Sequence, residues 1–190
     1  MRGAYIESYK DLYHGTTKAN AENIIVSQEF IPSREGWCGP GVYFYDNRSK
    51  AWWSAARTCD YEKRKGNVNV SPEIVIADIT TLEKKFILDL RSPDDLNEFA
   101  EFVNNFFSVC DFRIEEDLCE EKLLIRKRAL LLNFYCKEKD IQLIIGHFKQ
   151  RGQKRVENSQ EFAETWQLAI GVETIYCAKN PTIVCNIRGR

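Results

Sequence analysis

Three short motifs hold the side chains that are best suited to chemistry. They are Tyr13-His14-Gly15-Thr16-Thr17, Gly39-Pro40-Gly41-Val42-Tyr43-Phe44 and Glu173-Thr174-Ile175-Tyr176. The first supplies an imidazole that donates or accepts hydrogen bonds, the second a glycine-rich turn before a phenol, and the third a carboxylate at the start of a strand. Taken singly, each also fits a structural role as a satisfied His, a turn or a solvated Glu. Their order along one chain favours a functional interpretation.

Together the motifs resemble the diphtheria-toxin-like and poly(ADP-ribose)-polymerase-like branch of the ADP-ribosyltransferases, whose signature is a His, a Tyr and a Glu on three separate strands. His14-Gly15-Thr16 is similar to the family's His-Gly-[Ser/Thr] element, and residues 39–44 are similar to its Gly-x-Gly-[Ile/Val]-Tyr-Phe element. Glu173 corresponds to the late catalytic Glu. The resemblance covers the two ends of the chain better than residues 93–137. It implies NAD+ as co-substrate, no metal, and His14, Tyr43 and Glu173 as catalytic residues.

The chemistry of NAD+ cleavage agrees with a carboxylate at Glu173. The nicotinamide is a cationic pyridinium leaving group, so it departs without a metal or a general acid. Its loss develops positive charge on the ribose, as in the oxocarbenium-like transition state of glycoside cleavage, and a nearby carboxylate stabilises that charge. The same carboxylate can accept a hydrogen bond from a ribose hydroxyl and can orient or deprotonate the acceptor.

The other candidate residues are expected to hold NAD+. An imidazole at His14 can bond a ribose hydroxyl, while the backbone of Gly15 can approach the nicotinamide carboxamide closely because it has no side chain. Tyr43 offers a ring on which nicotinamide stacks. The resemblance implies a second ring from the following helix, which either Trp52 or Trp53 could supply, although both would equally fit the core. The expected NAD+-binding set is His14, Gly15, Thr16, Arg34, Gly41, Tyr43 and Trp53.

The acceptor is expected to be a protein or a nucleic acid. The basic stretch from Lys149 to Arg155 suits RNA, DNA or an acidic protein surface, and it equally fits a solvated loop. Transfer of single ADP-ribose units is the main prediction, and a compact chain of this kind would suit a bacterial or phage toxin or effector with an antitoxin or inhibitor partner. An NAD+ glycohydrolase and a non-catalytic module that binds NAD+ or nucleic acid are the alternatives.

Composition sets the remaining expectations. The chain has 190 residues and a formal net charge of -1, which fits one domain over residues 1–190 and no strong attraction to nucleic acid or membrane. No apolar run approaches the roughly 20 residues that span a bilayer, so a cytoplasmic protein is predicted. The seven cysteines form neither a CxxC pair nor a Cys/His zinc spacing, which favours reduced, mostly buried thiols and no metal site.

The residue pattern predicts an α+β fold. In the amino-terminal half we expect a strand up to His14, a helix capped by Thr16 or Thr17, a short strand over 42–45 and a helix over 49–58. Strands follow at 73–79 and 86–90, with a turn at Thr80-Thr81 between them.

In the carboxyl-terminal half, helices are predicted from Ser92-Pro93 to Phe107, over 116–137 and over 159–170. Strands are predicted at 141–145, ended by Gly146, at 173–177 and at 182–187. With the resemblance, the expected architecture is a split antiparallel β-sheet core surrounded by helices, with a helical insertion in the middle of the chain.

Overall fold

The computed structural model describes residues 6–109, 120–149 and 172–189. In chain order the strands and helices are β1 (Ile6–Thr17), α1 (Lys18–Ser27), β2 (Val42–Tyr45), α2 (Arg48–Arg64), β3 (Pro72–Glu83), β4 (Ile87–Asp89), α3 (Pro93–Val109), α4 (Glu120–Lys139), β5 (Leu143–Lys149), β6 (Val172–Ala178) and β7 (Val184–Arg188). Short 3-10 turns at Lys84–Phe86 and Pro181–Ile183 precede β4 and β7. The predicted α+β class is confirmed.

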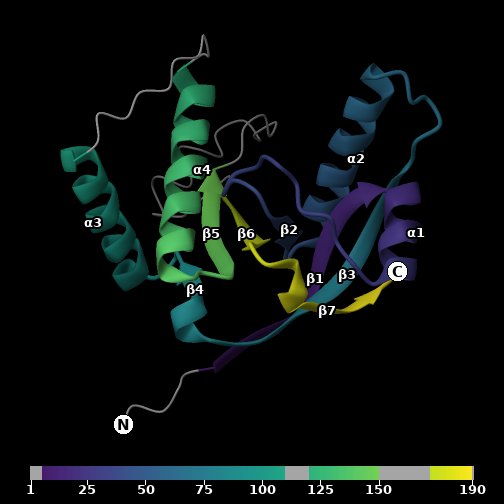
Figure 1. Ribbon diagram of the computed structural model, residues 1–190. Helices are drawn as coiled ribbons and strands as arrows, with labels where there is room; N and C mark the ends of the chain where they lie inside the picture. Colours follow the sequence, from purple (N-terminus) through teal and green to yellow (C-terminus); the bar gives the residue numbers. More distant parts are fainter. Residues whose placement is uncertain (1–5, 110–119, 150–171, 190) are drawn as a thin grey trace, which may run out of the picture.

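The strands form one seven-stranded sheet in the order β4-β5-β6-β2-β1-β3-β7 (Figure 1). Neighbouring strands are antiparallel except β4 and β5, which run parallel. The prediction of an antiparallel sheet is therefore wrong at this edge, where a crossover through α3 and α4 joins the two strands. The central order β6-β2-β1 brings the last long strand of the chain next to the first two.

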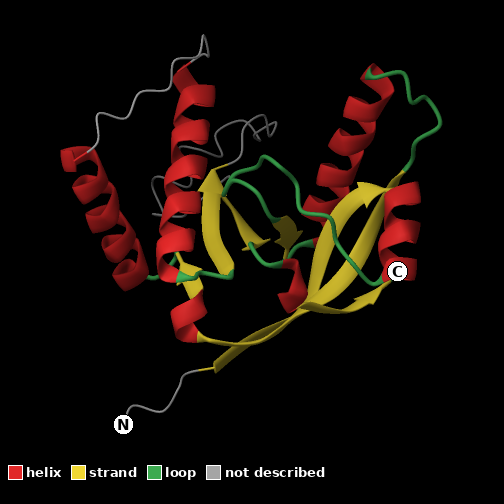
Figure 2. Ribbon diagram, in the orientation of Figure 1, coloured by secondary structure: helices red, strands yellow, loops and turns green. Residues whose placement is uncertain are grey.

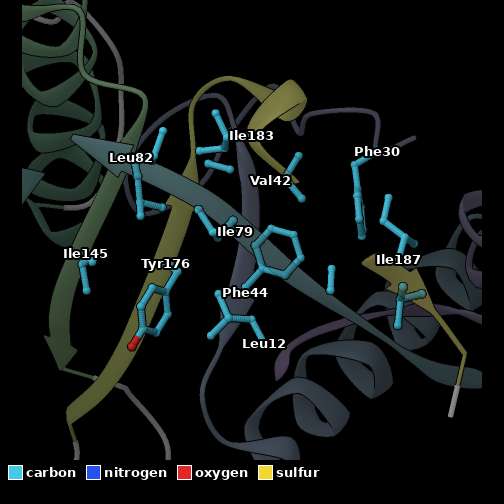
Figure 3. Close-up of a cluster of buried hydrophobic side chains, with 14 of the residues drawn as sticks. Leu12, Phe30, Val42, Phe44, Ile79, Leu82, Ile145, Tyr176, Ile183 and Ile187 are labelled. Atoms are coloured by element: carbon cyan, nitrogen blue, oxygen red, sulfur yellow. The ribbon is translucent and has the colours of Figure 1, made fainter. Parts of the chain in front are cut away.

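Helices flank the sheet at both ends, with α1 and α2 beside β1 and β3, and α3 and α4 beside β4 and β5 (Figure 2). Each face of the sheet has its own core. One core contains Phe30 and the α1 residue Ala21 (Figure 3). The other contains Ala51 of α2 together with Leu132 and Tyr135 of α4. Because side chains alternate along a strand, consecutive strand residues belong to different cores.

The amino-terminal elements follow their sequence signals, except that β1 continues to Thr17, three residues beyond its predicted end at His14. Thr17 is the N-cap of α1 and its hydroxyl accepts a hydrogen bond from the Asn20 backbone N–H at 3.3 Å. The predicted strand over 42–45 has the same bounds as β2. Asn47 caps α2, accepting from the Ser49 N–H at 2.9 Å, and the helix continues beyond the predicted end to Arg64. The β2–α2 connection is therefore short and fixed at the helix start.

Two positions that were predicted to end a strand lie inside one. Thr80 and Thr81 lie inside β3, whose later residues pair with the start of β1, including Leu82 opposite Glu7. Thr is a good strand former, and the long partner strand extends the ladder through both. Gly146 lies inside β5 opposite Ile175, so the prediction that it ends the strand is also wrong.

The middle and the end of the chain agree in part with prediction. The helices predicted from residue 93 and over 116–137 correspond to α3 and α4, with residues 116–119 outside the described residues. The helix predicted over 159–170 also lies outside them. Both carboxyl-terminal strands are present, but they lie far apart in the sheet, since β6 pairs with β2 and β5 whereas β7 pairs with β3.

Two expectations from composition can be compared with the described residues. Their cysteines are free thiols: Cys38, Cys59, Cys136 and Cys177 are buried and Cys185 is half-buried. The prediction of mostly buried thiols is confirmed for this part of the chain. Among the described helices, none combines the length and the apolar character that crossing a bilayer requires.

Candidate functional site

Glu173, the second residue of β6, is a buried carboxylate with one cationic partner. Its exposed fraction is 4%, and its Oε1 forms an ion pair with Nζ of Lys50, whose side chain is 24% exposed. Apart from this ion pair, neither carboxylate oxygen has a hydrogen-bond partner among the described residues. Burying a carboxylate is costly, and its oxygens can accept about four hydrogen bonds. Glu173 thus keeps unused accepting capacity in the interior.

The sheet register explains why Lys50 reaches Glu173. Tyr45 at the end of β2 lies opposite Ile175 of β6, so the start of α2 follows at the level of Glu173. Asn47 then caps the helix and places Lys50 in its first turn. A cation in the first turn is unfavourable with respect to the helix dipole. The ion pair with Glu173 offsets that cost.

A third residue, Tyr45, completes this cluster on the same face of the sheet. Burial raises the pKa of Tyr45, the Ser54 hydroxyl that hydrogen-bonds to it lowers that pKa, and the Glu173 charge raises it. The phenol is therefore neutral and lies between α2 and β6. Sequence reasoning missed Lys50, Tyr45 and Ser54. The available signal was the lysine itself, since a basic residue in the first turn of a capped helix needs an anionic neighbour.

Tyr43 lies on the same face as Glu173, because β2 pairs it with Cys177 and Glu173 and Cys177 alternate on one side of β6. Its hydroxyl donates to the Gly39 carbonyl and accepts from the Cys38 N–H at 3.0 Å. A Cβ on Gly36 would lie 2.4 Å from the ring carbon that carries the hydroxyl. Burial raises the pKa of Tyr43, so this phenol also stays neutral. The far end of the ring is thus enclosed by residues 36–39.

His14 projects from the opposite face of the sheet. Its ring packs edge-on against Phe30 and Phe44, with centroids 5.1 and 5.8 Å away, and both belong to the core on the α1 side. Its Nδ1 lies 2.9 Å from the Tyr43 carbonyl oxygen. Because a carbonyl only accepts, Nδ1 carries the proton and Nε2 is the accepting nitrogen. Burial lowers the pKa of His14, which favours this neutral form.

This hydrogen bond joins β1 and β2, whose register contains one residue pair. The register of β1 with β2 pairs Tyr13 with Tyr45, and the His14 imidazole bonds across to β2 just beyond that pair. His14 therefore links β1 directly to the backbone of Tyr43. The three residues predicted as catalytic lie on adjacent strands, with Tyr43 and Glu173 on one face and the His14 ring on the other.

Gly15 and Thr16 are both tightly packed by the protein itself. A Cβ on Gly15 would lie 1.9 Å from the Ala51 carbonyl oxygen, so the absence of a side chain lets α2 pack directly onto β1. Thr16 is 6% exposed, and its hydroxyl accepts from the Asn20 side chain at 3.5 Å. The glycine thus has a packing role, and the threonine is bonded within the turn that starts α1.

The loop before β2 holds two further candidates in different settings. Gly41 forms an isolated bridge with Ser33, and a Cβ on it would lie 2.5 Å from Sγ of Cys177. Arg34, in contrast, is exposed. The two tryptophans of α2 are exposed as well, at 43% for Trp52 and 39% for Trp53, so the alternative that they form part of the core is wrong.

Most of the predicted acceptor-binding stretch lies outside the described residues. Of the stretch from Lys149 to Arg155, residues 150–155 do so. Within the described ranges, no group of three or more His, Cys, Asp or Glu side chains could hold a metal ion.

The comparisons with known proteins give little to build on. No family model matches the chain, and no solved structure matches it significantly. The chain is similar to "Uncharacterized protein MJ0359" of Methanocaldococcus jannaschii, with 25% identity over 194 aligned positions that cover 91% of this chain and 83% of that protein.

Proposed function

We propose that this protein is an ADP-ribosyltransferase that cleaves NAD+ at the nicotinamide–ribose bond and transfers ADP-ribose to a macromolecular acceptor. The observation that carries the proposal is Glu173, a carboxylate that is 4% exposed, ion-paired with Lys50 and otherwise without hydrogen-bond partners among the described residues. The sheet order β6-β2-β1 supports it, since Glu173, Tyr43 and His14 lie on adjacent strands. The family's split antiparallel core is part of the same proposal.

Glu173 is the group that stabilises the developing positive charge. As the bond to nicotinamide breaks, its electron pair leaves with the pyridinium nitrogen and the ribose carbon becomes cationic. A fixed carboxylate in a poorly solvated site lowers the energy of that cation more than it would in water. The free acceptor positions of the carboxylate can bond a ribose hydroxyl in the same step.

Lys50 serves as the resting partner of that carboxylate. A buried carboxylate without a cation would be strongly unfavourable in the free enzyme. Lys50 is more exposed than Glu173, so its ammonium can turn toward solvent or toward a phosphate of NAD+ when the ribose approaches. The carboxylate is then left to face the cationic sugar, where it contributes to catalysis.

The geometry favours a positioning role for His14. The imidazole bonds the Tyr43 backbone and packs against Phe30 and Phe44, so it fixes the spacing of β1 and β2. The His14 ring lies on the opposite face of the sheet from Glu173, so His14 acts on the site through the position of Tyr43 and not by contact with the same ribose. Gly15, Thr16, Arg34, Gly41 and Tyr43 remain the proposed NAD+-binding residues. Trp53 leaves that set, because it lies on the side of α2 opposite the buried Ala51, Ala55 and Cys59.

Transfer with NAD+ labelled in its adenylate moiety tests the proposal. We expect purified protein to place label in macromolecular material of a cell lysate. Treatment with RNase, DNase or protease then identifies the acceptor class by the label that becomes soluble. Free ADP-ribose alone would indicate an NAD+ glycohydrolase, and an absence of turnover would favour a binding module.

A further inference from the structure

Helix α2 carries an alternating row of aromatic and cationic side chains. Trp53, Arg57, Tyr61 and Lys65 follow one another at four-residue steps, the last being the residue that caps the helix. Such spacing places them on one side of a helix. Cζ of Arg57 lies 4.9 Å from the centre of the Trp53 ring, and Nζ of Lys65 lies 4.1 Å from that of Tyr61. We refer to these four residues as the α2 stripe.

The α2 stripe faces away from the sheet. The buried residues of α2 are Ala51, Ala55 and Cys59, which form its inner side. Trp53 is 39% exposed and Tyr61 is 57% exposed. Both rings are therefore available at the surface of the helix. Here cations separate the rings, so the surface is unsuited to a purely apolar partner.

Positive charge is concentrated on this helix although the whole chain has a net charge of -1. The acidic residues of α2 are Asp60 and Glu62. The basic residues of α2 and its cap are Arg48, Lys50, Arg57, Lys63, Arg64 and Lys65. Lys50 is paired with Glu173, and Nζ of Lys65 lies 3.5 Å from Oε1 of Glu62, so the excess comes mainly from the other four. A local excess of this kind attracts an anionic partner.

We propose that the α2 stripe binds single-stranded nucleic acid. Proteins that bind single strands combine cations for the phosphates with aromatic rings on which bases stack, and the α2 stripe provides both in alternation. Arginine on a ring face adds a second planar surface for a base. A duplex hides the faces of its bases within the stack, so the unpaired strand is the better fit.

The position of the α2 stripe connects it to Glu173. Trp53 lies one helical turn after Lys50, and Lys50 pairs with Glu173. A strand bound along the α2 stripe would therefore lead toward the carboxylate, which makes nucleic acid the acceptor. This last step rests on the proposed transferase activity, whereas the binding itself does not.

Fluorescence anisotropy with labelled 15-nucleotide probes, oligo-U, oligo-dT and a duplex, tests the binding. We expect both single strands to bind more tightly than the duplex, and a difference between U and dT to indicate RNA or DNA. Tyr61→Ala should raise Kd at least about fivefold, the low end for one lost stacked base. Lys65→Gln should reduce the slope of log affinity against log salt by about 0.7. Trp52→Ala and Lys85→Gln are matched controls and should bind like the original protein.

Three results would overturn the proposal: no binding at low salt, equal affinity for the duplex, or stripe variants that bind like the controls. A fourth would be a protease-sensitive transfer product whose formation falls in Tyr61→Ala, because the surface would then dock a protein. Circular dichroism checks that each variant is folded. Nicotinamide release is measured in parallel, so strand binding without NAD+ turnover would refute the transferase and leave the nucleic-acid site standing.

Discussion

At the level of single residues, the central feature is a buried carboxylate with one cationic partner. Glu173 was singled out from the sequence through the motif that it begins, and the structure places it in the interior. Its partner Lys50 could not be found that way, because the pairing depends on β6 lying next to β2. A residue type can indicate chemistry. The contact that offsets the cost of burying its charge, however, depends on which strands are neighbours in the sheet.

Removing Lys50 tests how much the stability of the fold depends on the ion pair between Lys50 and Glu173. Lys50→Met leaves the Glu173 carboxylate buried without its cation, and we expect a loss of about 3 kcal/mol in the free energy of unfolding. The double variant Lys50→Met/Glu173→Gln should lose clearly less, since the amide carries no charge. Urea unfolding of these two variants and of Glu173→Gln alone measures the three losses. Strictly additive losses would show that the two residues do not interact.

The neutral state of His14 gives a prediction for pH. Because burial lowers its pKa, the unfolded chain takes up a proton at His14 before the folded protein does. The free energy of unfolding should therefore decrease as pH falls below about 6.5, the ordinary pKa of histidine.

Chemical denaturation between about pH 7.5 and pH 5 checks this prediction. His14→Gln, whose amide can still donate to the Tyr43 carbonyl, should lose less stability over that range than the original protein. His147→Gln removes the other histidine of the chain and distinguishes its contribution. An identical decrease in the original protein and in His14→Gln would contradict the assignment.

At the scale of elements, prediction succeeded where the signal is local. The Thr17 cap and the β2 residues follow from neighbouring residues alone, and both match. Prediction failed where pairing with a neighbouring strand determines whether a residue stays in its strand. Thr80 stays in β3 because β1 continues beside it, and Gly146 stays in β5, where a Cβ would lie 2.9 Å from the Phe148 ring.

The contact of β1 with α2 yields a third prediction. Gly15→Ala would place a methyl group 1.9 Å from the Ala51 carbonyl oxygen, so the helix must move. We expect a loss of about 1–3 kcal/mol in the free energy of unfolding, or more, together with lower transferase activity because Lys50 moves with α2. Thermal unfolding and NAD+ turnover measure both effects.

Gly189→Ala is the control for this substitution. Its added methyl group would meet only the end of the Ile25 side chain, at 3.3 Å, and that side chain can adjust. Its stability should change little. A Gly15→Ala protein as stable and as active as Gly189→Ala would show that the close packing of α2 on β1 is not required.

At the scale of the whole molecule, the decisive feature is the order of the strands. Local patterns predicted most strands, yet none could show that β6 inserts between β5 and β2 while β7 lies at the far edge. That order depends on contacts between residues far apart in the chain, which a single sequence does not display. The same strand order places the strands that carry His14, Tyr43 and Glu173 next to one another.

Release of nicotinamide is the most direct test of the central claim that Glu173 drives cleavage of NAD+. With NAD+ labelled in the nicotinamide ring, the original protein should release label, and Glu173→Gln should do so at least about 10²–10³-fold more slowly while its circular dichroism spectrum is unchanged. Glu35→Gln, in an exposed loop, should retain full activity. A folded Glu173→Gln protein that releases nicotinamide at the original rate would contradict the account.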